Sequence, residues 1–275
     1  MRLGVNVSEP TVIFDGSFTS PRLDHPECVV VGPDGALWCG GELGQIYRIE
    51  GQQIEQVAST GGFTLGLAFD EVGNLFICDL AAPCLWRLDA NSGVLEVFAD
   101  SVDGHELLTP NYPLVLPDGS LLVSDSGRAN EPRVGLVRFD ASGAGRIWHE
   151  QPLNFANGLA MSPDVSTVYV AETWAGRILA IDIDEHLMPR GPARVHAELD
   201  GYLPDGVAVD PAGVVYVGCY EPSAILRIPQ AGQVELFAHD ESAHMLCHPT
   251  NLAFRGSELI ASNLGRWHLT GFDLA

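Results

Sequence analysis

The chain has 275 residues, of which 46% are hydrophobic and 18% charged, and it is long enough to bury a large core in one domain or two. Acidic residues outnumber basic ones by 36 to 14, so a formal net charge of -22 repels nucleic acid and an anionic membrane surface alike. The first residues hold no basic segment followed by an apolar run, and no 18 apolar residues occur in succession. We therefore expect a cytoplasmic protein with neither nucleic-acid nor membrane partners.

A repeated unit of apolar strands runs through the chain. In chain order, its second strand reads ALWCGG, NLFICD, SLLVSD, TVYVAE, VVYVGC and ELIASN. Its third strand reads QIYRIE, CLWRLD, GLVRFD, RILAID, AILRIP and HLTGFD, and five copies of a fourth follow as IEQVAS, LEVFAD, GRIWHE, ARVHAE and VELFAH. These runs are rich in Val, Ile, Leu, Tyr and Trp and are bounded by Gly, Pro, Asp and Asn, which favours β-strand over helix.

The period of the repeat predicts the architecture. Equivalent positions recur at spacings of 38, 46, 46, 48 and 45 residues, and such a period with four strands per unit is typical of propeller blades. The sixth unit begins near residue 248 and has room for three strands, whereas the N-terminal segment TVIFDG (residues 11–16) has the composition of the missing fourth. We expect residues 1–275 to form one all-β domain, a six-bladed β-propeller with four antiparallel strands per blade, its last blade closed by the N-terminal strand.

One position of the first strand varies between the six units in an unusual way. Because the first strands of a propeller line its central channel, equivalent positions form a ring around the axis. This ring position is occupied by Glu27, Leu65, Asn111, Asn157, Asp205 and Thr250. Two carboxylates and two amide oxygens at one level of the channel favour a hard divalent cation, with calcium expected, magnesium or manganese as alternatives, and zinc less suited to an all-oxygen set.

A simpler interpretation exists for part of this ring. Asn157 and Asp205 each precede a glycine, and either pair alone fits an ordinary turn. Turn chemistry does not explain Glu27, which precedes a cysteine, or Asn111, which precedes a tyrosine. The metal hypothesis therefore depends on all four side chains meeting on the axis.

Two repeats, NGLAMSPDVSTVYVAETWAGRILAIDID and PDGVAVDPAGVVYVGC, together with the Glu, Asn, Asn, Asp quartet, resemble the senescence-marker-protein/gluconolactonase/luciferin-regenerating-enzyme family. The similarity extends over roughly residues 11–275. The resemblance implies a six-bladed propeller with one divalent cation in the channel, ligated by Glu27, Asn111, Asn157 and Asp205. It also implies lactone hydrolysis, with Asp205 as a candidate general base.

The chain departs from the sugar-lactone hydrolases of that family at one position. Those members carry an arginine two residues before the first Asn of the quartet, and here that position is Thr109. The Asp-Gly-Lys segment that follows in those members is also absent. The metal site is expected to be retained, and a less polar lactone or ester is as compatible with the sequence as an aldonolactone.

Further candidates lie near the mouth of the expected channel. His25 and His248 both stand two residues before the ring position, in units that ring closure makes neighbours, and could place a general base over the metal. Equally, both fit strand-entry residues hydrogen-bonded to the backbone. Tyr112, Trp174 and Tyr220 could wall a substrate pocket or pack between blades.

Acidic residues also recur at the end of the second strand. Asp79, Asp125 and Glu172 occupy this position in units two to four, where a second cation site is conceivable. Acids at such corners more commonly accept hydrogen bonds from backbone N–H groups. We expect them to fix the blade corners.

Six cysteines occur without a CxxC pair or an export signal, and we expect reduced thiols that are mostly buried. Cys247 beside His248 cannot supply the four ligands of a zinc site.

The sequence thus predicts a hydrolase dependent on a divalent metal, acting on a small-molecule lactone or related ester. In it, the metal polarises the carbonyl and activates water. Two alternatives remain at this point. One is a non-catalytic, metal-stabilised propeller that binds a protein or ligand. The other is an enzyme of the same fold with another reaction, such as phosphotriester hydrolysis or carbon–carbon bond cleavage.

Overall fold

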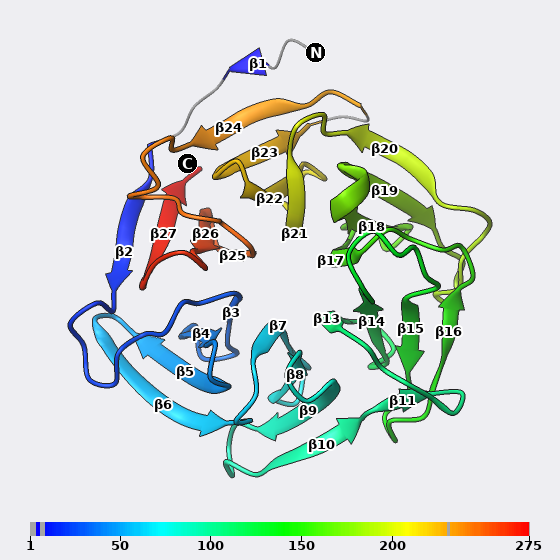
Figure 1. Ribbon diagram of the computed structural model, residues 1–275, viewed down its shortest axis with the longest axis horizontal. Helices are drawn as coiled ribbons and strands as arrows, with labels where there is room; N and C mark the ends of the chain where they lie inside the picture. Colours follow the sequence, from blue (N-terminus) through cyan, green and yellow to red (C-terminus); the bar gives the residue numbers. More distant parts are fainter. Residues whose placement is uncertain (1–3, 6–8, 230–231, 275) are drawn as a thin grey trace.

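The computed structural model describes residues 4–5, 9–229 and 232–274, and its strands form sheets arranged around a central axis (Figure 1). The first three blades are consecutive four-stranded antiparallel meanders. The first blade contains β3 (Val29–Val31), β4 (Leu37–Gly40), β5 (Gln45–Glu50) and β6 (Gln53–Ser59). The second contains β7 (Thr64–Phe69), β8 (Asn74–Asp79), β9 (Cys84–Asp89) and β10 (Leu95–Ala99). The third contains β13 (Pro110–Val115), β14 (Leu121–Asp125), β15 (Leu136–Phe139) and β16 (Gly145–His149).

The remaining three blades complete the circle. The fourth blade contains β17 (Ala156–Met161), β18 (Thr167–Glu172), β19 (Arg177–Asp182) and β20 (Arg194–Glu198). The fifth contains β21 (Leu203–Val209), β22 (Val215–Glu221), β23 (Ala224–Ile228) and β24 (Glu235–His239). The sixth contains β25 (Leu252–Arg255), β26 (Glu258–Ser262) and β27 (His268–Asp273) with β2 (Thr11–Asp15). The predicted six-bladed all-β propeller is confirmed.

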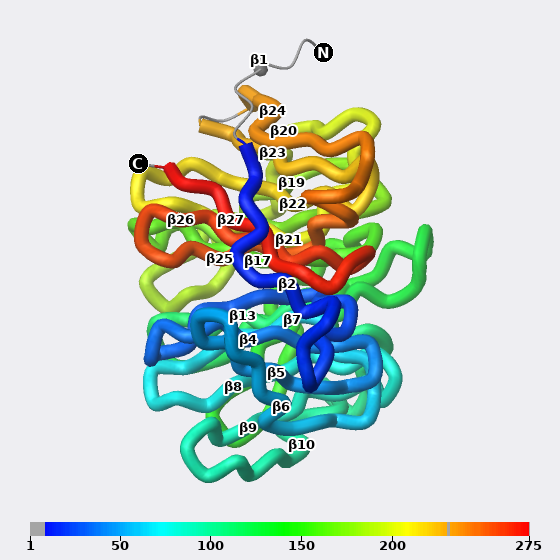
Figure 2. The backbone as a smooth tube through the Cα atoms, turned by 90° about the vertical axis from the view of Figure 1, so that its left-hand side faces the viewer, coloured from blue at the N-terminus to red at the C-terminus, as the bar shows by residue number. Residues whose placement is uncertain are grey.

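The last blade combines both ends of the described chain. Strand β2 pairs antiparallel with β27, with Thr11 opposite Gly271 and Asp15 opposite His268, and the two strands run side by side in Figures 1 and 2. Phe14 of β2 is 1% exposed and packs in an apolar cluster with Leu37 and Tyr47 of the first blade. The predicted closure is therefore confirmed, and it is stabilised by packing between the sixth and first blades as well as by strand pairing.

Three short elements lie outside the repeat. Strand β1 (Gly4–Val5) pairs in parallel with β24 and gives the fifth blade an additional edge strand. The hairpin of β11 (Ser101–Val102) and β12 (His105–Glu106) stands between the second and third blades. A 3₁₀ turn, η1 (Thr173–Ala175), follows β18. Their shortness explains why the period of the sequence does not reveal them.

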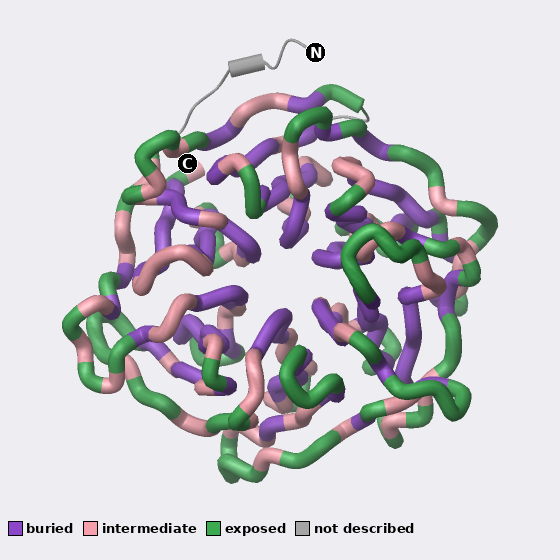
Figure 3. The backbone as a smooth tube through the Cα atoms, in the orientation of Figure 1, coloured by how far each residue is buried: buried purple, intermediate pink, exposed green. Residues whose placement is uncertain are grey.

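Apolar side chains pack between neighbouring blades, and the segments nearest the axis are the most buried (Figure 3). Between the third and fourth blades, Leu122, Val170 and Leu179 are each at most 1% exposed. Strands in a propeller face a neighbouring blade on both sides, so their apolar runs are continuous rather than strictly alternating. This packing makes the ring rigid around its channel.

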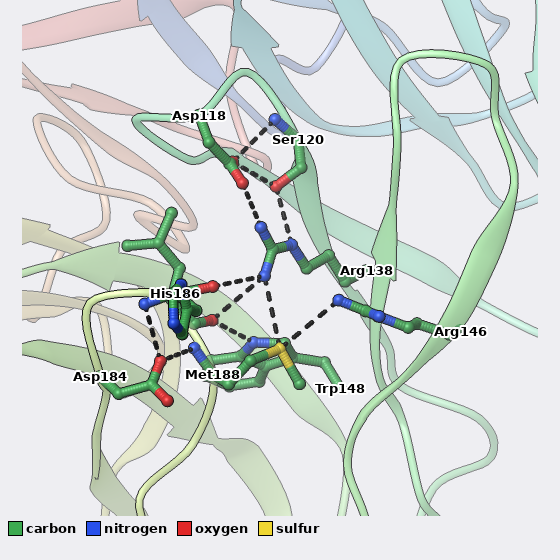
Figure 4. A network of polar contacts seen from close by, with 9 residues as sticks. Asp118, Ser120, Arg138, Arg146, Trp148, Asp184, His186 and Met188 are labelled. Carbon is green, nitrogen blue, oxygen red and sulfur yellow. Dashed lines mark hydrogen bonds and ion pairs between the residues drawn. The ribbon is translucent and has the colours of Figure 1, made fainter.

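A buried arginine adds a polar tie between the third and fourth blades (Figure 4). Arg138 of β15 donates to Ser120 Oγ at 2.8 Å and forms an ion pair with Asp118 in its own blade. Its Nη1 also donates to the backbone oxygen of His186, at 3.1 Å, in the loop after β19. None of these residues is among the described residues that line the channel cavity.

Glycines allow the inner strands to approach each other closely. A Cβ atom at Gly158 would lie 2.5 Å from the backbone oxygen of Asp205, and one at Gly206 would lie 2.5 Å from that of Thr250. Each contact joins the inner strand of one blade to that of the next, where any side chain would collide with backbone. The glycines that follow Asn157 and Asp205 are therefore packing requirements of a narrow channel.

Candidate active site

The four ring residues with carboxyl or amide side chains line one cavity of about 560 Å³ at the channel. Asn111, Asn157 and Asp205 belong to β13, β17 and β21, and Glu27 lies two residues before β3. All four side chains are buried, with residue exposures of 3–7%. Leu65 and Thr250, the other two ring residues, line the same cavity. The structure thus brings together the quartet that the sequence predicts as a metal site.

The orientation of Asn157 is set by a residue of the adjoining turn. Its Nδ2 donates to Thr173 Oγ1 at 3.2 Å, and that hydroxyl in turn donates to the backbone oxygen of Pro204 at 2.8 Å. Because the amide nitrogen is engaged, the amide oxygen is left available, and Asn157 Oδ1 is buried without a hydrogen-bond partner. Thr173 was not anticipated from sequence, since it lies in η1 outside the repeat.

Glu27 is fixed by the neighbouring sixth blade. Asn251 Nδ2 donates to Glu27 Oε2 at 3.2 Å, and Ser262 Oγ donates to the Glu27 backbone oxygen at 2.8 Å. The Thr250 hydroxyl also donates to the Glu27 backbone oxygen. Asn251 was likewise missed, although its place directly after a ring residue offered a signal.

The acids at the ends of the second strands hold the segments that enter the ring. Asp79 accepts from the backbone N–H of Phe63 at 3.1 Å, and Asp125 accepts from that of Thr109 at 2.6 Å. Glu172 accepts from the N–H of Asn154 at 2.7 Å. The expected corner role is confirmed, and these acids position the loops that lead into the ring.

The quartet fits an oxygen-seeking cation. Glu27 and Asp205 bring two buried carboxyls into the cavity, and no lysine, arginine or histidine is among the described residues that line it. Three oxygens of the quartet, one each from Asn111, Asn157 and Asp205, are buried and unpartnered. A buried carboxylate without a partner is costly, and hard divalent cations take carboxylate and amide oxygens. These residues therefore form a donor set suited to calcium, magnesium or manganese.

Burial disfavours the charged forms of both carboxyls, and repulsion from Asp205 adds to this effect at Glu27. Burial raises the pKa of Glu27 well above its usual value, and the nearby Asp205 raises it further. Burial raises the pKa of Asp205 to about 7, although the contact with Asn157 opposes this shift.

We expect the stability of the metal-free protein to fall as pH rises from about 4 to above 7. A carboxyl with a raised pKa in the folded state holds its proton more tightly than in the unfolded state. Its contribution to stability is therefore full at pH values below the pKa of the unfolded state and is lost as the pH rises through the pKa of the folded state. The loss should be a few kcal/mol, since one pKa unit is about 1.4 kcal/mol.

Calorimetry in EDTA and in calcium should show a larger gain of Tm from calcium at pH 8 than at pH 5. In the double variant Glu27→Gln, Asp205→Asn this pH dependence should disappear, and an equal calcium gain in that variant would contradict the assignment.

The cavity walls include some of the predicted pocket residues. Thr109, Trp174 and Tyr220 line it, together with several apolar residues that sequence reasoning missed, namely Phe63, Leu80, Phe155, Leu203 and Leu264. Leu80, Trp174 and Leu264 follow the second strand of their blades, and Tyr220 lies near the end of the second strand of its blade, β22. Comparing this region across the repeats would have identified them.

Tyr112 does not belong to this wall, which corrects one sequence expectation. Its side chain packs against the apolar clusters between blades, beside Cys28, Leu67 and Leu159. The physical reason is strand alternation: because Asn111 faces the channel, the next residue of β13 faces the opposite side.

The two histidines also lie outside the described lining of the cavity. His25 Nδ1 pairs with Asp24 at 3.2 Å, and its ring lies 4.9 Å from that of Trp267. His248 stacks on Tyr220 at 4.5 Å, and its Nδ1 lies 2.8 Å from the Tyr220 backbone oxygen. The structure therefore places no imidazole pair among the described lining residues, and the contact of His248 with a backbone oxygen fits the alternative of a strand-entry residue. Both have positive φ angles, 33° and 50°, which turn the chain at the strand entry.

All six cysteines are free and buried, as predicted. A second acidic group, Asp24, His25 and Glu42, places ligand atoms within 4.8 Å of one another at half-exposed positions. His25 already pairs with both acids there, which explains the cluster without an ion.

Fold and site together define a six-bladed β-propeller with a candidate cation centre in its channel. A family model described as SMP-30/Gluconolactonase/LRE-like region matches residues 26–260, and the chain belongs to this family. No helix among the described residues is long and apolar enough to cross a bilayer.

The individual proteins that resemble this chain share a low sequence identity with it. The chain is 28% identical over 202 residues to a 6-deoxy-6-sulfogluconolactonase of Pseudomonas putida, covering 68% of each protein. It is 26% identical over 225 residues to the adipocyte plasma membrane-associated protein Hemomucin of Drosophila melanogaster, covering 70% of this chain and 38% of that protein. Among solved structures, a calcium-binding regucalcin of Agrobacterium tumefaciens superposes with a TM-score of 0.77 at 18% identity, over 98% of this chain and 95% of that one.

Proposed function

We propose that this protein is a divalent-metal-dependent hydrolase acting on a lactone or a related ester, with calcium as the metal. One observation carries the proposal: two carboxyls and two amides converge in a buried cavity that no described basic side chain lines, with three of their oxygens unpartnered. The similarity to a sulfogluconolactonase supports the reaction class, and the likeness to a calcium-binding regucalcin supports the choice of ion.

Glu27, Asn111, Asn157 and Asp205 would hold the cation. A divalent cation in such a ring supplies Lewis-acid polarisation of a carbonyl and a lowered pKa for water. The chain supplies the orientation, because Thr173 turns the Asn157 amide oxygen towards the cavity and Asn251 fixes one carboxylate oxygen of Glu27.

Asp205 is the proposed base. Glu27 Oε2 is held by Asn251, whereas Asp205 Oδ1 is buried without a hydrogen-bond partner. Asp205 takes a proton from the attacking water as the water oxygen bonds to the carbonyl carbon. The acyl carbon–oxygen bond then breaks, and the proton passes to the departing alkoxide, which gives a carboxylic acid and an alcohol.

A panel of lactones and aryl esters, assayed after chelation and after separate addition of calcium, magnesium or manganese, tests this function. We expect hydrolysis that is lost in EDTA and restored by calcium. Unchanged turnover after exhaustive chelation would overturn the metal mechanism. A Tm lowered by chelation, with no substrate hydrolysed, would favour a non-catalytic scaffold whose metal is structural.

A further inference from the structure

Apolar side chains from four blades surround the mouth of the cavity. Leu80, Trp174 and Leu264 lie between the second and third strands of their blades, Tyr220 lies near the end of β22, and all four line the cavity. Leu80, Trp174 and Tyr220 are 39%, 40% and 38% exposed. Large apolar side chains at a cavity mouth gain by burial when an apolar ligand covers them.

The hydroxyl groups of the lining threonines are already engaged. Thr109 Oγ1 donates to the backbone oxygen of Gly127 at 3.0 Å, and the hydroxyls of Thr173 and Thr250 donate to the backbone oxygens of Pro204 and Glu27. Each of these protons is committed within the protein. The oxygens of a polyhydroxylated ligand would receive no hydrogen bond from these threonines, at a cost of roughly tenfold in affinity for each bond left unmade.

The charges of the residues that line the cavity also limit which ligands fit. The ionisable groups that line the cavity, apart from the Tyr220 hydroxyl, are Glu27 and Asp205, and no described lining residue offers a positive charge to an anionic substituent. A carboxylate, sulfonate or phosphate on the body of the substrate would therefore find no partner in the walls.

We propose that the cavity takes an uncharged lactone or ester whose carbonyl bears an apolar alkyl or aryl body, and that it discriminates against sugar lactones. This inference rests on the proposed function for its account of the carbonyl end. The apolar body would lie against Leu80, Trp174 and Leu264, and Phe63 and Phe155 line the same cavity.

Two measurements on the calcium-loaded protein test the inference. The first compares kcat/KM for δ-lactones of increasing alkyl chain length with that for glucono-δ-lactone. We expect a rise of up to about fourfold for each methylene that enters the cavity. Equal or faster hydrolysis of glucono-δ-lactone, with no dependence on chain length, would overturn the inference and leave the proposed function standing.

The second measurement is independent of turnover. Alkyl δ-lactams resist hydrolysis, and their binding can be followed by calorimetry. Affinity that rises with chain length would support an apolar site even if no ester were hydrolysed, in which case only the proposed function would fail. Long-chain lactams that bind no better than the unsubstituted ring would overturn the inference.

A matched pair of leucines provides the control. Leu80 and Leu43 occupy the same turn in the second and first blades, but only Leu80 is among the described residues that line the cavity, and Leu43 is 70% exposed. We expect Leu80→Ala to weaken long-chain lactam binding roughly fivefold and to leave the unsubstituted ring almost unchanged. Leu43→Ala should change neither. Equal effects of the two substitutions would contradict the placement of the apolar body.

Discussion

Replacing Asp205 with asparagine should reduce lactone or ester hydrolysis by about a thousandfold while the propeller remains folded. The substitution removes the proposed base, whose contribution is typically 10²–10⁴-fold. It also removes one of two charges available to the cation, so calcium affinity should fall in parallel. The folded state should tolerate the change, because a buried carboxyl whose pKa is raised to about 7 is replaced by a neutral group of the same shape. Calcium titration, circular dichroism and kcat/KM on the best substrate of the panel measure these effects.

An aspartate-to-asparagine substitution at Asp210, just beyond the C-terminal end of β21, is the control. Asp210 directly follows β21 and accepts hydrogen bonds from the N–H groups of Ala212 and Val214 at 2.9 Å, which an asparagine oxygen can also accept. Asp210→Asn should therefore retain both activity and calcium affinity. Full turnover in Asp205→Asn, or an equal loss in Asp210→Asn, would remove Asp205 from the proposed chemistry.

Phe14→Ala should lower the stability of the protein by about 3–5 kcal/mol, the usual cost of removing a buried phenylalanine side chain. Phe14 is 1% exposed and packs where the N-terminal strand closes the sixth blade against the first. For a domain of this size, the loss corresponds to a fall in Tm of roughly 10 °C. Differential scanning calorimetry with calcium present measures it.

A second phenylalanine nearby serves as the comparison. Phe18 is 100% exposed, three residues after β2. Phe18→Ala should leave Tm within about 1 °C, since exposed substitutions seldom exceed 0.5 kcal/mol. Similar melting temperatures for the two variants would mean that β2 is not required to close the ring.

The repeat in the sequence was sufficient to predict the propeller and its closure, because strand composition and period are both local properties that recur six times. The quartet was predictable for the same reason, since symmetry converts equivalent positions along the chain into a ring in space. The calcium assignment and the catalytic role of Asp205 stay predictions.

Residues outside the repeat could not be placed in this way. Thr173 depends on a 3₁₀ turn that occurs in one blade, and the hydrogen bond from Asn251 to Glu27 depends on ring closure. The aromatic character of Tyr112 fits both a pocket wall and packing between blades, and the alternation of β13 decides for the second. His25 and His248 share a position in the repeat, but the structure places both outside the described lining of the cavity, with positive φ angles that the sequence does not reveal.

The turn after the second strand has a consequence for how this protein can change. Leu80, Trp174 and Leu264 follow the second strand, Tyr220 lies near the end of it, and the four come from separate sheets, while the corner acids anchor the entry segments of three blades. A mutation in one such turn need not disturb the others. Combinatorial libraries restricted to these four codons should thus yield altered selectivity without loss of expression. Natural divergence can change selectivity by substitutions at the same four positions.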